Sequence, residues 1–100
     1  MISPAMSSCL GDWLDHQRAL KGAAANTISA YRTDVLSFLH FMTQHTGDSL
    51  GLGPISRVAI TDMRSWMAHE RGRGVAARSL ARSLSAVKSF YSWLAEREGF

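Results

Sequence analysis

The sequence predicts an all-α fold, most simply one compact four-helix bundle. In four separate stretches, apolar residues recur at steps of three and four, which places them along one face of an α-helix. No stretch alternates apolar and polar side chains convincingly, and no hairpin dipeptide such as Asn-Gly occurs. The 100 residues, 46% of them hydrophobic, suffice for one folded core and are too few for two.

The first expected helix runs from Ser8 to Lys21. Its apolar stripe passes through Trp13, and Ser7 or Ser8 offers a side-chain oxygen to the free amides of the first turn. Gly22 follows the last periodic residue, where a glycine commonly ends a helix. A short loop over 22–25 should therefore follow.

The second expected helix runs from about Thr27 to Thr46, after Asn26. The next segment, 47–54, is dense in glycine and ends in proline, which predicts a loop. We expect this loop to be exposed, to be the most mobile internal segment and to be the first site of proteolytic cleavage. The apolar stripe of the second helix consists of Ile28, Tyr31, Val35, Phe38, Leu39 and Met42.

The third expected helix is short, from about Asp62 to Arg71. Thr61 is the expected N-cap, and Asp62 suits the positive end of the helix dipole. Gly72 and Gly74 should end this helix and lead into a short loop over 72–76.

The fourth helix is the best defined and continues to about Arg97. Its apolar stripe, centred on Leu80, also contains Leu84, Val87, Tyr91 and Leu94. The residues before it, 75–77, are valine and two alanines, which offer no side-chain cap to its first turn.

The composition excludes several classes of protein. A single cysteine, Cys9, allows no intrachain disulfide and no cysteine-cluster zinc site, and it suits a reducing cytoplasm. No apolar run approaches the roughly 18 residues that cross a bilayer. The first residues lack the basic and apolar regions of a secretory signal. We therefore expect a cytoplasmic protein without membrane partners.

The chain offers few residues for catalysis. Its four histidines are scattered along the chain, and none forms a His-x-x-x-His or His/Cys cluster. Cys9 has no obvious base partner, and no glycine-rich phosphate loop is present. We expect no cofactor, no metal and no catalytic residue. Tyr31 and Tyr91 both fall on apolar stripes, so both should serve packing.

The charge is unevenly distributed. The net charge is only +3, yet between Arg64 and Lys88 six basic residues accompany one acid, Glu70. This asymmetry indicates either a basic helix surface that is merely solvated or a surface for a polyanion. Charge alone leaves both interpretations open.

Two helices present faces of small polar residues. Serines between arginines keep a helix surface low and supply donors to phosphate, although ordinary surface composition explains them equally well. On the second helix these residues are Ser29, Thr33, Ser37 and His40, with Arg32 at the flank. On the fourth helix, opposite Leu80, they are Arg78, Arg82, Ser85, Ser89, Ser92 and Glu96.

Two long runs resemble a known family. Residues 26–39 resemble the N-T-x-x-x-Y-x-x-D-L-x-x-F-L run of the phage-integrase-like tyrosine recombinases. Residues 78–94 resemble the run of that family that begins R-S-L-A-R-x-L-S-A, most of all in its Xer group and its XerC-like kind. Residues 13–22 fit the same group.

The resemblance implies the fold and partners of this chain. It implies an N-terminal, SAM-like core-binding domain over 1–100, whose second and fourth helices approach the major groove. It also implies a separate C-terminal catalytic domain, absent from this sequence, and an end at Phe100 that looks like a domain boundary. The expected partners are a double-stranded DNA recombination site and, in the full enzyme, a second recombinase subunit. The DNA contacts it implies are Asn26, Thr27, Arg32, Arg78, Arg82, Ser85, Lys88 and Ser89.

The parent enzyme, by the same resemblance, cuts and rejoins DNA through a phosphotyrosine and resolves chromosome dimers. This chain alone should be a monomer that binds DNA and cleaves none. A helical protein-interaction module that does not bind DNA is the alternative, because a helical bundle of this kind also serves that purpose and a fold does not determine a function.

Overall fold

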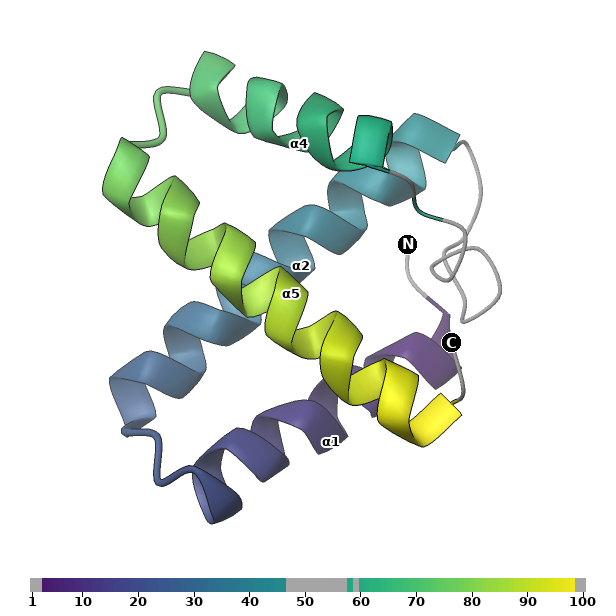
Figure 1. Cartoon of the computed structure of the whole chain (residues 1–100), viewed down its shortest axis with the longest axis vertical. Coiled ribbons are helices and arrows are strands. Elements are labelled where there is room, and N and C mark those ends of the chain that lie inside the picture. The colour runs from purple at the N-terminus through teal and green to yellow at the C-terminus, as the bar shows by residue number, and fades with distance from the viewer. Residues whose placement is uncertain (1–2, 47–57, 59, 99–100) are drawn as a thin grey trace.

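The computed structural model describes residues 3–46, 58 and 60–98, and this part of the chain is helical with no strand (Figure 1). The all-α prediction is thus confirmed. The loop expected over 47–54 lies outside the described residues. The helices are α1 (Pro4–Leu20), α2 (Ala25–Thr46), α4 (Ile60–Gly72) and α5 (Ala77–Glu98).

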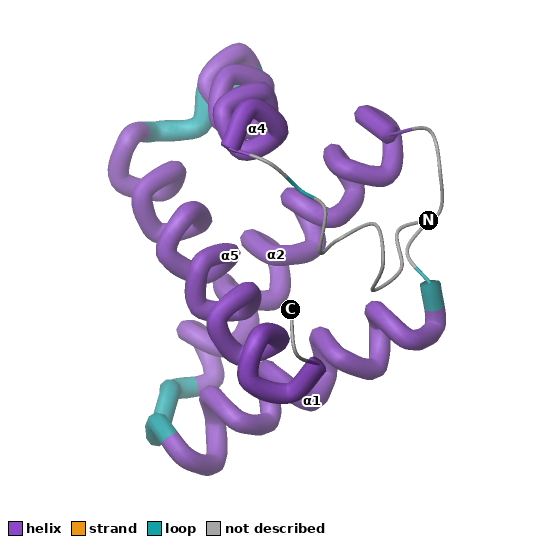
Figure 2. The backbone as a smooth tube through the Cα atoms, turned by 45° about the vertical axis from the view of Figure 1, so that its right-hand side comes forward, coloured by secondary structure: helices purple, strands orange, loops and turns teal. Residues whose placement is uncertain are grey.

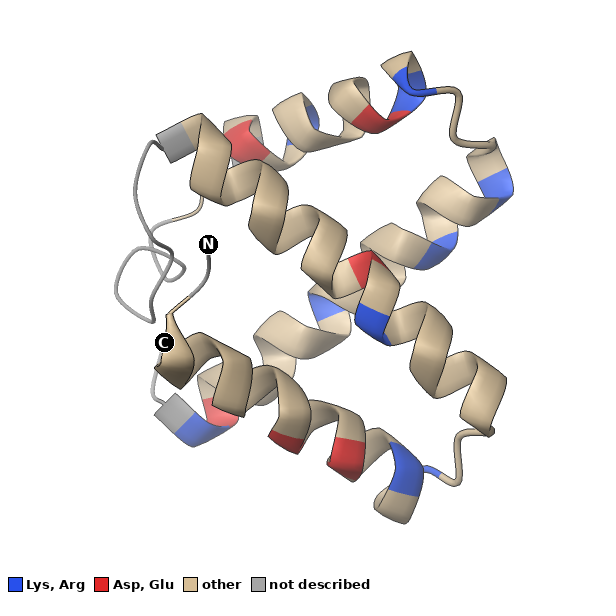
Figure 3. Cartoon of the chain, turned by 180° about the vertical axis from the view of Figure 1, so that it is seen from behind, with Lys and Arg blue, Asp and Glu red and all other residues tan. Residues whose placement is uncertain are grey.

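The helices α2 and α5 cross each other at the centre of the molecule and form its most extensive helix contact. In Figure 1, α5 lies nearer the viewer, and from behind, in Figure 3, α2 lies nearer. The tube in Figure 2 shows α1 and α4 on either side of this crossing. Two linkers, 21–24 and 73–76, lie along one side of the molecule, which we call the linker edge.

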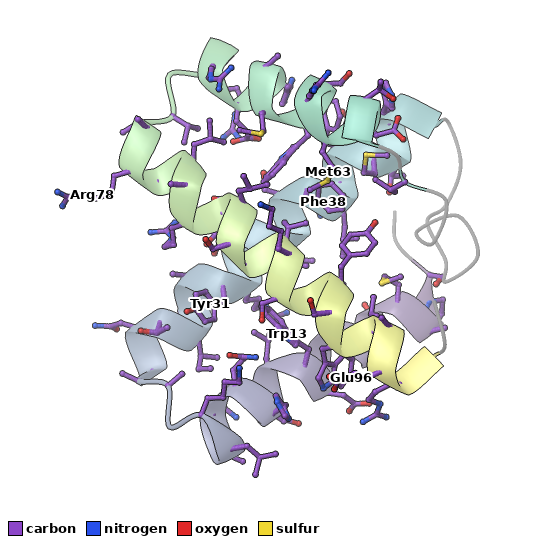
Figure 4. The ribbon with its side chains drawn as sticks, in the orientation of Figure 1. Trp13, Tyr31, Phe38, Met63, Arg78 and Glu96 are labelled. Atoms are coloured by element: carbon purple, nitrogen blue, oxygen red, sulfur yellow. The ribbon has the colours of Figure 1, made fainter. Side chains whose placement is uncertain are left out.

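The core is built from aromatic side chains of all four described helices. Trp13 of α1 meets Phe90 of α5 edge-on, with ring centroids 5.4 Å apart, and Phe38 of α2 meets Trp66 of α4 in the same way at 5.2 Å. These four side chains are 0% exposed, and Figure 4 shows Trp13 and Phe38 pointing inward. The apolar stripes therefore form one core, as expected from their spacing.

The start of α1 differs from the expected one. Ser3 is the N-cap, its side chain accepts a hydrogen bond from the amide of Met6 at 3.1 Å, and Pro4 occupies the first helical position. Proline suits that position because its φ is already helical and it has no amide to satisfy. Ser7 and Ser8 therefore lie inside the helix, and the predicted start at Ser8 was wrong.

Each linker contains a glycine in the left-handed region. Gly22 has φ 65° and Gly74 has φ 83°. After α4, the amide of Val75 donates to the carbonyl of Glu70 at 3.1 Å, and the amide of Gly74 donates to that of Arg71 at 3.0 Å. This pair of bonds is a Schellman motif, and it turns the chain sharply from α4 into α5.

The remaining helix starts carry smaller corrections. Helix α2 begins at Ala25, so Asn26 and Thr27 lie in its first turn. Helix α4 begins at Ile60, so Thr61 lies inside the helix, and the predicted N-cap role of Thr61 was wrong. Among the described residues, no helix is long and apolar enough to cross a membrane.

Candidate nucleic-acid interface

The solvent-facing side of α5 differs from the side that the apolar pattern predicted. Its buried residues include Ala86, Phe90 and Trp93, so at about 100° per residue the buried face is centred about 60° away from Leu80. The expectation that Leu80 marks the centre was wrong, and Ser89 is half-buried at the margin. Five exposed polar residues of α5, which we call the outward band of α5, are Arg78, Ser85, Lys88, Ser92 and Glu96.

Arg82 reaches α2 from the edge of this band. Its Nε donates to Oδ2 of Asp34 at 2.9 Å, and its Nη2 donates to Oδ1 at 2.9 Å. Ser83 donates to the same Oδ1 at 2.9 Å. The Asp34 side chain is 4% exposed, whereas that of Arg82 is 48% exposed. We call these three residues the polar crossing.

The polar crossing has an electrostatic consequence for Arg82. The hydrogen bonds that Arg82 donates to Asp34, and then the negative charge of Asp34, raise the pKa of the Arg82 guanidinium. One edge of the guanidinium is bonded to the carboxylate, and the side chain remains 48% exposed, so the opposite edge, the outer edge, is the part left for another contact. If Arg82 contacts DNA, as predicted from the sequence, it does so with that outer edge.

A second buried carboxylate lies in the same region. Glu70, 6% exposed, accepts hydrogen bonds from Nη1 of Arg73 at 2.8 and 3.0 Å and from the hydroxyl of Ser37 at 3.2 Å. Ser37 is thus half-buried and bonded, although the sequence placed it on an open polar face. Both carboxylates border one cavity of about 220 Å³, lined by Thr33, Asp34, Ser37, Glu70, Arg73, Val75, Ser79, Arg82 and Ser83.

The expected contact residues of α2 are mostly open to solvent. Asn26 and Arg32 are exposed, and Thr27 is half-buried. Ser29 and Thr33 are exposed, and the Thr33 hydroxyl donates back to the Ser29 carbonyl at 3.1 Å. His40, also exposed, lies farther along α2. Asn26, Thr27, Ser29 and Thr33 are uncharged hydrogen-bonding residues, and Arg32 adds a positive charge to this face.

The two polar faces do not lie on one surface. Because α2 and α5 pack against each other, their outward faces point to opposite sides of the molecule, as Figures 1 and 3 show. Both helices begin at the linker edge, so their first turns lie along the same side of the molecule. Figure 4 shows Arg78 projecting from this edge into solvent. The structure thus brings the first turn of α2 and the first turn of α5 to the same side.

Basic residues gather at the linker edge. Lys21 follows α1, and Arg71 and Arg73 lie at the end of α4 and in the linker after it. All three are exposed, and Figure 3 shows their basic segments beside the two linkers. Sequence reasoning did not select them as site residues. A sequence pattern could have identified them: each is a basic residue beside a glycine at the end of one helix, shortly before a helix with a polar face begins.

The helix starts at this edge favour an anion. The first bonds of α2 and α5 run to the carbonyls of Ala24 and Ala76, which have no side-chain acceptor for the remaining amides. Within the described helices, the first turns of α2 and α5 hold no acidic residue. No acidic side chain of the first turn therefore neutralises the positive end of either helix dipole. A phosphate oxygen is a suitable acceptor for such amides.

The tyrosines serve packing, as expected. Tyr31 lies 5.8 Å from Trp13 and Tyr91 lies 6.1 Å from Phe38, measured between ring centroids. Both are half-buried against the core. Burial raises the pKa of the Tyr91 hydroxyl, and the charge of Asp62 raises it further. Among the described residues, no group of three or more His, Cys, Asp and Glu could hold a metal ion.

Comparison with known proteins adds an independent finding. Residues 10–98 match the family described as phage integrase, N-terminal SAM-like domain. The tyrosine recombinase XerC of Rhodospirillum centenum is 36% identical over 89 residues, which are 89% of this chain and 25% of that protein. XerC of Chlorobaculum parvum is 38% identical over 88 residues, 87% of this chain and 26% of the relative.

XerC of Nitrobacter winogradskyi is 39% identical over 87 residues, which are 87% of this chain and 27% of that protein. The chain therefore spans about a quarter of the length of these curated relatives. No solved structure matches the chain.

Proposed function

Because the chain belongs to the phage integrase family of N-terminal SAM-like domains, we propose that it binds double-stranded DNA as one half of a recombinase clamp. The observation that carries this proposal is the linker edge. Two helices begin there without an acidic residue in the first turn, and exposed Lys21, Arg71, Arg73 and Arg78 surround them. An edge with unneutralised helix starts and arginine donors suits a phosphate backbone.

The residues take different parts in this binding. Arg78 and Lys88 neutralise phosphates from the outward band of α5, and Arg32 does so from α2. Asn26 and Thr27, in the first turn of α2, donate hydrogen bonds to phosphates or base edges. Ser85 and Ser89 allow the DNA to approach α5 closely. Arg82 adds the outer edge of its guanidinium.

The whole enzyme supplies the chemistry in this proposal. The chain is a single core-binding domain over residues 1–100, and a catalytic domain elsewhere in the recombinase cuts DNA through a phosphotyrosine. In the bacterial cytoplasm, a Xer-type enzyme of this kind works with a second recombinase subunit to resolve chromosome dimers at cell division. The names of the relatives, tyrosine recombinase XerC, support this assignment.

A salt titration tests the proposal. We expect the chain to bind a labelled duplex of mixed sequence with a Kd of about 10⁻⁶ to 10⁻⁴ M, weakening steeply between about 50 and 200 mM salt. Removing one phosphate contact with Arg78→Ala should make the slope of log K against log salt shallower by about 0.9. Fluorescence anisotropy at several salt concentrations measures both quantities.

The matched control is Arg64→Ala, which removes an equally exposed arginine from the first half of α4, away from the linker edge. It should leave the slope close to that of the wild type. Equal slopes for the Arg78 and Arg64 variants would contradict the proposed surface. Absence of salt-dependent binding by the wild type would favour the protein-interaction module instead.

A further inference from the structure

The polar crossing joins the two helices that carry the proposed DNA contacts. The buried carboxylate of Asp34, on α2, accepts three hydrogen bonds, and all three come from Arg82 and Ser83 of α5. Each bond is 2.9 Å long. Two parallel bonds from a guanidinium to a carboxylate restrict direction as well as distance. This bond set therefore constrains how α2 and α5 are oriented where they cross.

The rest of the α2–α5 contact restricts orientation less. Its buried side chains, such as Val35, Phe38 and Phe90, are apolar. Close packing of such side chains favours certain crossing angles with a scatter of about 15–20°, whereas a bidentate guanidinium–carboxylate pair restricts direction more narrowly. The polar crossing therefore adds a directional restraint to the one that side-chain packing supplies.

We propose that Asp34 and Arg82 are positioning residues for DNA binding: they hold the first turns of α2 and α5 at the spacing that lets both reach one duplex. This inference rests on the proposed function. It assigns to Asp34 a role in DNA affinity although its side chain, 4% exposed, cannot itself meet DNA. It also gives the two edges of the Arg82 guanidinium different roles. The inner edge, bonded to Asp34, positions α2, and the outer edge contacts DNA.

The competing explanation makes the opposite prediction. If Arg82 acts only as a phosphate contact, Asp34 competes with DNA for its guanidinium. Asp34→Asn would then release Arg82, remove one negative charge and tighten DNA binding. If Asp34 positions the two helices, the same substitution weakens binding despite the gain in positive charge. The sign of the change therefore distinguishes the two roles.

Glu70 provides a matched charge control. It is as deeply buried as Asp34 and borders the same cavity, but its arginine partner, Arg73, is three residues away along the chain. Glu70→Gln removes the same negative charge without touching the bonds between α2 and α5. Its affinity for DNA should equal or exceed that of the wild type.

A stability control is also needed, because Asp34→Asn lowers stability as well. Met6→Ala removes a fully buried side chain from α1, a helix that contributes no residue to the polar crossing. It should lower the thermal midpoint without lowering DNA affinity at a temperature where the variant remains folded. Each variant is titrated with the same labelled duplex of mixed sequence, and circular dichroism confirms folding at the temperature used.

We expect Asp34→Asn to weaken binding about tenfold, as the loss of one good contact would, and to make the salt slope shallower. Equal or tighter binding by Asp34→Asn, or an equal loss in Met6→Ala, would overturn the inference while the proposed function stands. A wild type that shows no salt-dependent binding would sink the proposed function itself.

If Asp34→Asn does not fold, Ser83→Ala tests the same inference. It removes one of the three bonds to the carboxylate and leaves all charges in place. We expect binding to weaken about threefold, in keeping with the modest contribution of a single hydrogen bond. Unchanged affinity in this variant would refute the positioning role.

Discussion

Two buried carboxylates border the same cavity, and they differ in how far along the chain their arginine partners lie. Asp34 is bonded by Arg82 and Ser83, which follow it by 48 and 49 residues. Glu70 is bonded by Arg73, three residues later, and by Ser37 at 3.2 Å. The first carboxylate joins α2 to α5 where they cross. The second bonds to the linker after α4 through Arg73 and to α2 through Ser37.

This difference determines how much each ion pair contributes to the orientation of the helices. The turn after α4 is already held by backbone bonds and by the left-handed Gly74, so the Glu70–Arg73 pair adds to a structure that local bonds define. Helices α2 and α5 have no backbone bond between them at their crossing, among the described residues. The Asp34–Arg82 pair therefore supplies orientation that the local chain cannot.

The largest effect should come from breaking the remote pair. Arg82→Ala leaves the buried Asp34 carboxylate with Ser83 as its bonded partner, and an uncompensated buried charge costs about 3–5 kcal/mol of unfolding free energy. We expect a value of about 3 kcal/mol, because the Arg82 side chain is half exposed and its charge is partly screened. Urea unfolding followed by tryptophan fluorescence measures this loss.

Arg78→Ala is the control for that measurement, one helical turn earlier on α5. Arg78 is exposed, so its loss should change the unfolding free energy by no more than about 0.5 kcal/mol. If both variants lost the same stability, the distinction between the outward band and the polar crossing would not hold.

A smaller loss of stability should come from a substitution in the turn between α4 and α5. Gly74→Ala forces an alanine into φ 83°, where a side chain costs about 1–2 kcal/mol. The space around this glycine is open, so the cost lies in the backbone and not in a clash. Thermal unfolding should show a lower midpoint. DNA affinity below that midpoint should stay within about twofold of the wild type, because the α2–α5 crossing is untouched.

A large loss of DNA affinity in Gly74→Ala would mean that the turn, and not the crossing, sets the position of α5. Gly72→Ala is the control, because Gly72 is helical and equally free of neighbours. It should keep or slightly raise the unfolding free energy.

The smallest effect concerns Tyr91, a half-buried side chain whose hydroxyl, unlike the two carboxylates, carries no charge at neutral pH. Burial raises the pKa of Tyr91 above its ordinary value near 10. The folded chain then keeps this proton at pH values where the unfolded chain loses it. The stability contribution is therefore fully present below about pH 10 and is lost as the pH rises above it.

Comparison of the wild type with Tyr91→Phe between pH 8 and 11 checks this expectation. The phenylalanine variant should lose less stability above about pH 10, since it has no phenol to titrate. Parallel curves for the two proteins would show that the Tyr91 hydroxyl titrates equally in the folded and unfolded chains.

Much of the fold was predictable because its signals are local. Apolar spacing identified all four described helices, and Gly22 and Gly74 marked the turns that their positive φ values require. The cap of α1 was missed because Ser3, Ser7 and Ser8 are all plausible caps, and the choice depends on the proline that follows Ser3.

The candidate site was predicted only in part. Arg78, Ser85 and Lys88 are exposed on α5, as expected, and Asn26 and Arg32 are exposed on α2. The apolar pattern of α5 did not reveal which side is buried, because Ala86 and Trp93 are buried, while Leu84 and Tyr91 are only half-buried. A rotation of about 60° moved Arg82 from the centre of the expected polar face to its edge.

The sequence by itself determined the helices, the turns and the family, because each depends on residues close together or on a run of matched residues. The tertiary structure decided which arginine remains free and which one is bonded to Asp34. That choice depends on where α2 crosses α5, and the crossing brings together residues 48 apart in the chain. No periodicity within one helix contains that information, since it arises only when two helices pack against each other.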